Sequence, residues 1–316
     1  MRILSLGAGA LGGYFGGRLV QAGADVTFLV RPGRQAQLAE QGLVIESPFG
    51  DARLPVRTLT EADLGTTAAP GFDLVLLTCK AYDLDSAIAA IRPAMGPGTA
   101  VLPVLNGLSH IATLQREFGA AQVLGGIAKI QATLTPAGVV KQLNDWRWLT
   151  FGETDGTLSP RVQALAAIAG RAEGLVAEAV PDIMRRMWEK LVHLGTSALG
   201  TVLMRANTGE IARAPGGVAF MHRILARNAA IAAAHGHLMK PGFLADFEAL
   251  FADPAGGYAA SMLRDLEAGG RIEADHILGF LLEAARSAGV PHELHEAAYL
   301  HAKAFEQRRD AGRLPR

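Results

Sequence analysis

The sequence predicts two domains of different class: an α/β domain built on a parallel sheet, followed by an all-α domain. In the first half, short β-branched strands alternate with helices, which is the pattern of a parallel sheet covered by helices. From Asp182 onward the pattern is helix after helix, separated by segments rich in Gly and Pro. The 316 residues, half of them apolar, suffice for two cores. We place the boundary at residue 178, which gives domains 1–178 and 179–316.

The first domain is expected to contain strands and helices in alternation, interrupted by two hairpins. The strands are expected at Arg2–Leu6, Asp25–Val30, Leu74–Thr78, Ala100–Leu102 and Val123–Ile127. The helices between them are expected at Leu11–Ala22, Asp83–Ile91 and Ser109–Phe118. The hairpins are expected at Leu43–Val56, with its turn at Pro48–Gly50, and at Lys129–Phe151, with its turn at Pro136–Gly138 and with Trp146 and Trp148 on the return strand.

Charge and composition exclude several classes of partner. Thirty Lys and Arg balance thirty Asp and Glu, so neither nucleic acid nor an anionic membrane surface is expected as a partner. The longest apolar stretch, Leu191–Met204, is shorter than the roughly 18 residues that a membrane-spanning helix needs. The chain opens directly with a strand pattern, so no cleavable signal is expected. We therefore expect a cytoplasmic protein, and the apolar helical domain is compatible with a homodimer.

Neither a disulfide nor a metal site is expected. Cys79 is the only cysteine, which excludes an internal disulfide and a cysteine-based zinc site. No HExxH motif or carboxylate cluster at ligand spacing is present, and His292 and His295 share a helix without obvious partners.

A glycine-rich loop, Gly7-Ala-Gly9-Ala-Leu-Gly12, directly follows the first strand and opens a helix. In a dinucleotide-binding βαβ unit the first glycine permits the tight turn. The second lets the backbone approach the pyrophosphate, and the third allows close packing of helix on strand. The first amide groups of the helix, here at Ala10 and Leu11, are available to phosphate. The loop therefore predicts a Rossmann-type cofactor site; a glycine turn without ligand is the alternative.

The residue at the end of the second strand indicates which dinucleotide is bound. NAD sites usually carry Asp or Glu there, to bind the ribose 2′-hydroxyl, whereas this chain has Arg31, with Arg34 close by. Asp25 lies at the opposite end of that strand. Because a guanidinium suits a 2′-phosphate, Arg31 favours NADP(H). The alternative is a pair of solvated loop arginines.

Two polar residues follow other strands of the predicted sheet, at the edge where ligands bind in open α/β sheets. Lys80 follows the strand at Leu74–Thr78, and Asn106 follows the strand at Ala100–Leu102. Either could contact a ligand. Lys80 could equally be a surface lysine, and Asn106 could equally form a turn or a helix N-cap.

The helical half contains three further candidates. Lys190 lies among apolar residues of a helix at Met184–Leu203, where it would either extend to solvent or protonate a substrate carbonyl oxygen. Glu273 is expected to begin a helix at Glu273–Ala288, a position that favours acidic residues in any protein. Ser261 could be an ordinary residue at a helix start. Periodicity gives no reason to unite these three side chains.

Several motifs, in order along the whole chain, resemble the ketopantoate reductase (2-dehydropantoate 2-reductase) family. The motifs are Gly7-Ala-Gly-Ala-Leu-Gly-Gly-Tyr-Phe-Gly16, Cys79-Lys-Ala-Tyr82, Leu105-Asn-Gly-Leu108, Trp188-Glu-Lys-Leu191 and Ser261-Met-Leu-Arg-Asp265 with Glu273. The resemblance implies a C-terminal domain like that of 6-phosphogluconate dehydrogenase and an active site between the domains. It also implies NADPH-dependent reduction of ketopantoate to pantoate, a step of pantothenate and coenzyme A biosynthesis.

The resemblance further implies a role for each candidate residue. Lys190 would be the general acid, and Glu273 would lie near the reacting hydroxyl and the lysine. Ser261 would hold the substrate carboxylate, and Asn106 would sit between substrate and nicotinamide. The cofactor would be bound by Gly7, Gly9, Ala10, Leu11, Gly12, Arg31, Lys80 and Asn106.

One departure from the family concerns the substrate. The family typically has asparagines one and two helical turns after its lysine, where this chain has Leu194 and Ala198. Thr196 and Ser197 are near, and His193 adjoins the gap. Because such hydrogen-bonding groups discriminate between substrates, a different, more apolar 2-keto acid is an alternative to ketopantoate. A catalytically inactive NADP(H)-binding sensor is a second alternative, which retention of the lysine and the glutamate disfavours.

Overall fold

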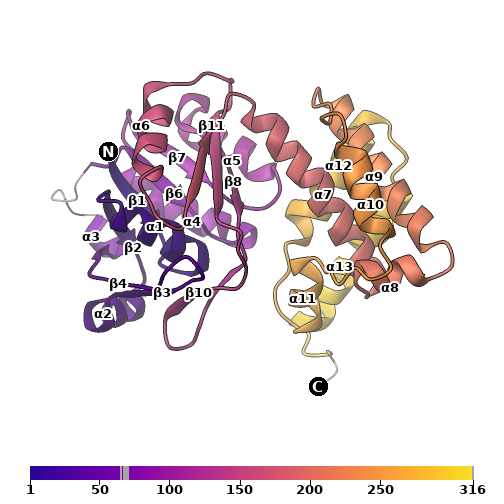
Figure 1. Cartoon of the computed structure of the whole chain (residues 1–316), viewed down its shortest axis with the longest axis horizontal. Helices are drawn as coiled ribbons and strands as arrows, with labels where there is room; N and C mark the ends of the chain where they lie inside the picture. The colour runs from indigo at the N-terminus through magenta and orange to yellow at the C-terminus, as the bar shows by residue number, and fades with distance from the viewer. Residues whose placement is uncertain (65, 67–70, 315–316) are drawn as a thin grey trace. The chain divides into compact units, whose positions relative to one another are not determined.

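The computed structural model describes residues 1–64, 66 and 71–314, which form two compact units. The first unit consists of Met1–Leu105 and His110–Ile183, and the second of Asn106–Ser109 with the chain from Met184 onward. The first unit is α/β and the second is helical, as the sequence predicts (Figure 1). Apart from Asn106–Ser109, the second unit begins at Met184, near the start of the helix Ile183–Met204. The domain boundary at residue 178 stays a prediction.

The strands of the first unit are short and mostly buried. They are β1 (Arg2–Leu6), β2 (Asp25–Leu29), β3 (Leu43–Glu46), β4 (Ala52–Leu54), β5 (Arg57–Leu59), β6 (Leu74–Leu77), β7 (Ala100–Pro103), β8 (Leu124–Lys129), β9 (Ala132–Leu134), β10 (Val139–Gln142), β11 (Trp148–Glu153) and β12 (Val176–Ala179). The helices of this unit are α1 (Ala10–Gln21), α2 (Pro32–Gln41), α3 (Glu61–Leu64), α4 (Leu84–Ile91), α5 (Ser109–Phe118) and α6 (Pro160–Ala169).

The central sheet is parallel and has the strand order β5-β2-β1-β6-β7. Strand β1 pairs with both β2 and β6, so the chain crosses to one side of β1 and then to the other. The carboxyl ends of β1 and β6 meet at a point where the strand order reverses, which is where open α/β sheets bind ligands. The glycine-rich loop leaves β1 at this point.

A second sheet, of order β4-β3-β10-β9, packs against helix α1. A Cβ on Gly13 would lie 2.7 Å from a methyl carbon of Val140, and a Cβ on Gly17 would lie 2.6 Å from Ile45. Helix α1 therefore approaches this sheet too closely for side chains at either position. The predicted hairpin at Leu43–Val56 is formed by β3 and β4.

A third sheet, of order β12-β11-β8, corrects two details of the sequence prediction. Strand β8, expected in the parallel sheet, is joined to it only by a bridge between Val101 and Val123 among the described strands. The second predicted hairpin is shorter than expected, because the turn at Pro136–Gly138 joins β9 to β10. Trp148 instead begins β11, which pairs antiparallel with β8, and Trp146 lies in the preceding loop.

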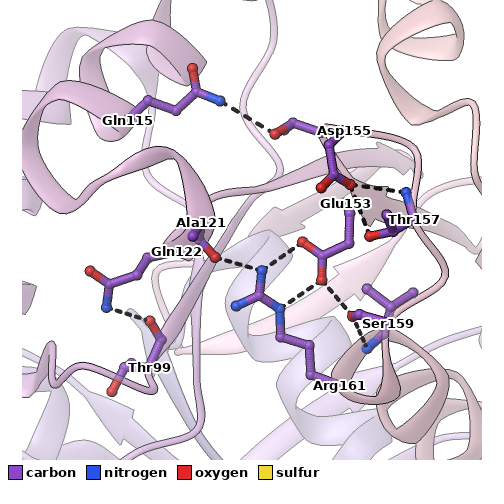
Figure 2. Close-up of polar contacts among 11 residues, drawn as sticks. Thr99, Gln115, Ala121, Gln122, Glu153, Asp155, Thr157, Ser159 and Arg161 are labelled. Atoms are coloured by element: carbon purple, nitrogen blue, oxygen red, sulfur yellow. Dashed lines mark hydrogen bonds and ion pairs between the residues drawn. The ribbon is translucent and has the colours of Figure 1, made fainter.

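An ion pair between a buried carboxylate and a partly exposed arginine lies at the end of the third sheet. Glu153, the last residue of β11, accepts hydrogen bonds from Arg161 Nε at 2.7 Å and Nη2 at 2.6 Å. It also accepts one from the Ser159 hydroxyl at 2.5 Å. Figure 2 shows Arg161 reaching back from α6 to this carboxylate and to the carbonyl of Ala121. The cluster ties β11 to the start of α6.

The second unit is helical throughout. Its helices are α7 (Ile183–Met204), α8 (Thr208–Arg213), α9 (Gly217–Ala234), α10 (Phe243–Ala252), α11 (Ser261–Glu267), α12 (Phe280–Ala288) and α13 (Glu293–Asp310). A buried chain of hydrogen bonds links three of them. His295 on α13 bonds Asn228 on α9 at 2.8 Å, and the Asn228 amide donates to Thr196 on α7 at 3.0 Å. None of the helices in the described ranges is long and apolar enough to cross a membrane.

Candidate functional site

The three glycines of the loop occupy three different surroundings. Gly7 has φ +87°, which favours glycine, and its N–H donates to the carbonyl of Leu29 at 2.8 Å. A Cβ on Gly12 would lie 2.3 Å from the Gly7 carbonyl oxygen and 2.8 Å from Thr78 Oγ1. A Cβ on Gly9 would meet no atom within 4 Å. The first and third glycines therefore shape the turn, whereas the second borders open space.

These surroundings fit a dinucleotide. The open space at Gly9 leaves room for a pyrophosphate to approach the backbone, and the loop leads directly into the first turn of α1. The amide groups at the start of a helix lack partners within the helix, and the helix dipole places partial positive charge there. Ala10 and Leu11 belong to this turn, as expected for phosphate-binding residues.

Two hydroxyl groups support the loop from the strands beneath it. Ser5 Oγ donates to the carbonyl of Gly7 at 3.2 Å, and Thr78 Oγ1 donates to the carbonyl of Leu6 at 2.9 Å. Neither Ser5 nor Thr78 is among the site residues predicted from the sequence. Small hydroxyl residues in otherwise apolar strands beside the loop were the available signal.

The two arginines after β2 lie in different environments. Arg31 is the exposed N-cap residue of α2, and its side chain makes no hydrogen bond or ion pair within the described ranges. Arg34 is partly buried and donates to the carbonyl of Ala8 in the glycine-rich loop. Only Arg31 is thus available for a ligand phosphate without breaking existing contacts.

The residues after β6 and β7 differ in their surroundings. Lys80 is exposed and precedes a short 3-10 turn. Asn106 is partly exposed and belongs to the second unit by its contacts. The loop that carries it packs tightly: a Cβ on Gly107 would lie 2.6 Å from the carbonyl oxygen of His276, and Ser109 Oγ lies 3.0 Å from His276 Nδ1.

Glu273 lies three residues before His276, so this packing brings the Asn106 loop close to the segment that carries the glutamate. Glu273 is only 5% exposed and directly precedes a helical segment that begins at Ala274, one residue later than predicted. Its carbonyl accepts the N–H of Ile277 at 3.2 Å, and a π-helical turn at Asp275–Gly279 precedes α12. Single π-helical turns are frequent at functional sites.

The structure brings the charges of Lys190 and Glu273 together. Lys190 lies on α7, and burial lowers the pKa of its ammonium group to about 8. The carboxylate of Glu273 acts in the opposite direction and raises the pKa of Lys190. A lysine with this pKa can donate a proton near neutral pH.

Ser261 is the first residue of α11 and is partly exposed. None of its hydrogen bonds within the described ranges ties it to Lys190 or Glu273, so a role for its hydroxyl stays a prediction.

Aromatic rings surround the face of α7 that follows Lys190. The ring of His193 stacks on Phe247 at 4.3 Å between centroids and lies 5.7 Å from the ring of Tyr258. Leu194 is partly exposed, and Ala198 is fully buried. The sequence analysis did not identify the aromatic residues, although the four-residue spacing of phenylalanines along α10 was a visible signal.

The two hydroxyl residues of this segment do not replace the asparagines typical of the family. Thr196 Oγ1 donates to the carbonyl of Val192 at 2.7 Å, and Ser197 Oγ donates to the carbonyl of His193 at 2.9 Å. Both residues are fully buried, and both hydroxyl groups donate to carbonyl oxygens of their own helix. In the described part of the chain, no group of three or more His, Cys, Asp or Glu side chains could hold a metal ion.

Comparison with known proteins assigns a family to both parts of the chain. The family described as ketopantoate reductase PanE/ApbA matches residues 3–156, and its C-terminal counterpart matches residues 182–306. The solved structure of 2-dehydropantoate 2-reductase from Methylococcus capsulatus is 27% identical, with a TM-score of 0.87 and 98% of each chain covered.

Two curated relatives are each 30% identical. The uncharacterized oxidoreductase YkpB of Bacillus subtilis aligns over 97% of this chain and 99% of its own length. The 2-dehydropantoate 2-reductase of Halobacterium salinarum aligns over 90% of this chain and 92% of its own length. The chain therefore belongs to the ketopantoate reductase family and is an NADP-dependent oxidoreductase of the 2-dehydropantoate 2-reductase type.

Proposed function

We propose that this protein reduces 2-dehydropantoate to pantoate. Membership of the family supports the more general reaction, the reduction of a 2-keto acid. The observation that carries the proposal is the Lys190–Glu273 pair. Burial lowers the pKa of the lysine to about 8, and the nearby Glu273 carboxylate opposes this lowering. A lysine of this kind is mostly protonated at neutral pH and is a stronger acid than an ordinary lysine.

The proposed reaction converts the keto group into a secondary alcohol. NADPH, when bound at the glycine-rich loop, would be the source of the hydride that the substrate's C2 carbon accepts. As the C2 carbonyl oxygen gains negative charge, the ammonium of Lys190 stabilises it and transfers a proton to it. The products are the 2-hydroxy acid and NADP⁺, and the neutral lysine recovers its proton from solvent.

The other predicted residues bind and orient in this proposal. Glu273 holds the ammonium of Lys190, and its burial strengthens that attraction because water screens it poorly. The Asn106 amide lies between substrate and nicotinamide, and the Ser261 hydroxyl binds the substrate carboxylate. Arg31, exposed after β2, binds the 2′-phosphate.

A second candidate substrate is a 2-keto acid with a more apolar side chain. It is favoured by the wall that follows Lys190, where Leu194 and Ala198 replace hydrogen-bonding residues and His193 stacks on Phe247. Pantoate carries a second hydroxyl group, whose binding groups would have to come from elsewhere. A site without such groups gives an apolar side chain the advantage.

The test is steady-state oxidation of NADPH with a panel of 2-keto acids: 2-dehydropantoate, 2-oxo-4-methylpentanoate and phenylglyoxylate. Turnover of 2-dehydropantoate with the highest kcat/KM, abolished in Lys190→Ala, supports the proposal. A preference for either apolar acid supports the second candidate. Lys141→Ala removes an exposed lysine on β10 and serves as the matched control.

Tight NADPH binding without reduction of any acid would instead indicate a sensor. The cytoplasmic location and the homodimer expected from the sequence stay predictions.

A further inference from the structure

Arg34 joins three elements that are far apart in the sequence. Its Nε and Nη2 donate to the carbonyl oxygen of Ala8 at 3.3 and 3.0 Å. Its Nη1 donates to the carbonyl oxygen of Gly138 at 3.0 Å and to Gln37 Oε1 at 2.5 Å. The guanidinium thus links the glycine-rich loop to α2 and to the turn between β9 and β10.

The bond to Ala8 fixes the direction of one peptide group in the loop. A trans peptide is planar, with its carbonyl and its N–H pointing in opposite directions. Holding the Ala8 carbonyl therefore directs the N–H of Gly9 away from Arg34. That N–H has no acceptor within the described ranges, and a Cβ at Gly9 would meet no atom within 4 Å. The Gly9 amide is thus presented to open space, where a pyrophosphate can accept from it.

Gly138 makes this arrangement possible. Its φ is +82°, and a Cβ there would lie 2.5 Å from Arg34 Nη1 and 2.3 Å from Gln37 Nε2. A side chain at this position would strain the turn and push the Arg34 guanidinium and the Gln37 amide from their present places. Gln37 on α2 and the carbonyl of Gly138 in the second sheet's turn hold the guanidinium, so it is fixed on the side that does not contact the glycine-rich loop.

The partners of Arg34 are all neutral. None of the described ion pairs includes it, so its positive charge remains uncompensated beside the loop. Such a charge attracts any anion bound at the loop, whether or not the adenosine ribose carries a 2′-phosphate. Arg31, three residues earlier, is exposed at the start of α2.

We infer that Arg34 is a positioning residue that orients the Ala8–Gly9 peptide toward the cofactor's pyrophosphate, a role distinct from the 2′-phosphate contact proposed above for Arg31. This inference deepens the proposed function, because it rests on the glycine-rich loop being the cofactor site. The two arginines lie three residues apart in the sequence, but in this proposal they act on different parts of the same dinucleotide.

The test uses two fragments of the cofactor. ADP-ribose carries the pyrophosphate without a 2′-phosphate, and adenosine 2′-monophosphate carries the 2′-phosphate without a pyrophosphate. Dissociation constants are measured by calorimetry for the full chain and for Arg34→Met and Arg31→Met. For Arg34→Met we expect ADP-ribose to bind about tenfold more weakly or worse, and adenosine 2′-monophosphate to change by less than about twofold. For Arg31→Met we expect the reverse pattern.

Two further variants guard against loss of folding. Gly138→Ala displaces the guanidinium without removing it and should weaken ADP-ribose selectively. Arg34→Lys cannot bridge Ala8 and Gly138 at once and should do the same. A general structural defect would weaken both fragments together, and that outcome, with the melting temperature lowered, overturns the inference.

Other outcomes also overturn it. They are selective loss of adenosine 2′-monophosphate in Arg34→Met, and unchanged binding of ADP-ribose in both Arg34 variants. If the unmodified protein reduces 2-keto acids with NADPH but the Arg34 variants bind normally, only this inference fails. If the unmodified protein binds neither NADPH nor ADP-ribose, the proposed function fails as well.

Discussion

Replacing Glu273 by glutamine should lower the pH at which the reductase loses activity on the alkaline side. Glutamine keeps the size of the side chain and removes its charge. In the native protein, burial lowers the pKa of Lys190 to about 8 although the Glu273 carboxylate raises it. In Glu273→Gln only the effect of burial remains, so the pKa of Lys190 falls below about 8.

The size of the shift follows from the charge that is lost. An opposite charge within about 4–6 Å typically moves a pKa by about 1–3 units. A loss of about one unit would move the alkaline limb from about pH 8 to about pH 7, because the reduction needs Lys190 protonated. At pH 7.5 the protonated fraction, and with it kcat/KM, would then fall roughly threefold from this cause alone.

The assay is kcat/KM for the preferred 2-keto acid, measured between pH 6 and 9.5 at saturating NADPH. Oxidation of the 2-hydroxy acid needs Lys190 neutral, so its rate should rise where the rate of reduction falls. Glu283→Gln, which changes an exposed glutamate paired with Arg286, is the matched control and should leave the limb in place. An alkaline limb that stays at its native pH in Glu273→Gln, or moves upward, would refute the reasoning.

Three further predictions concern the cofactor loop and stability. Gly12→Ala should weaken NADPH binding at least about tenfold, because its Cβ would lie 2.3 Å from the Gly7 carbonyl oxygen; an unchanged Kd in a fluorescence titration would contradict this. Glu153→Gln should lower the free energy of unfolding in urea by about 2 kcal/mol, since Arg161 and Ser159 lose a charged acceptor; a loss below about 1 kcal/mol would show that solvent replaces these bonds. Burial lowers the pKa of His295 to about 4 in the folded protein, whereas the unfolded chain takes up this proton near pH 6.5, so stability should fall by about 3 kcal/mol as pH falls from 6.5 to 4. His295→Gln should flatten that decline.

The cofactor loop could be predicted from the sequence because its structure is decided locally. Gly7, Gly9 and Gly12 stand between a strand and a helix that pack on each other, and the contacts that explain the first and third come from neighbouring strands. The alternation of strands and helices in the first unit is equally local, since each crossover is short. The helical second unit followed from periodicity alone.

The third sheet could not be predicted in the same way. The antiparallel pairing of β8 with β11 competes with a place in the parallel sheet, and apolar strands of this length suit both. The π-helical turn after Glu273 has a similar cause. Tyr299 and Lys303 on α13 both bond Asp275 within this turn, and the sequence around Asp275 gives no sign of partners that lie on a later helix.

A sequence can predict which kind of ligand a site takes without assigning a role to each residue of the site. Arg31 and Arg34 are an example. Both arginines follow β2, and both have the charge that a phosphate requires, so residue type and position alone treat them as a pair. What separates them is the carbonyl of Gly138, which lies more than a hundred residues later and is near Arg34 only because β10 pairs with β3. The same reasoning applies to the helix face after Lys190, where the surroundings of His193 depend on rings carried by α10. The proposed basis of NADP preference is one exposed side chain, Arg31, which can be read from the sequence. The face beside His193 is assembled from residues of different helices, which the sequence does not bring together.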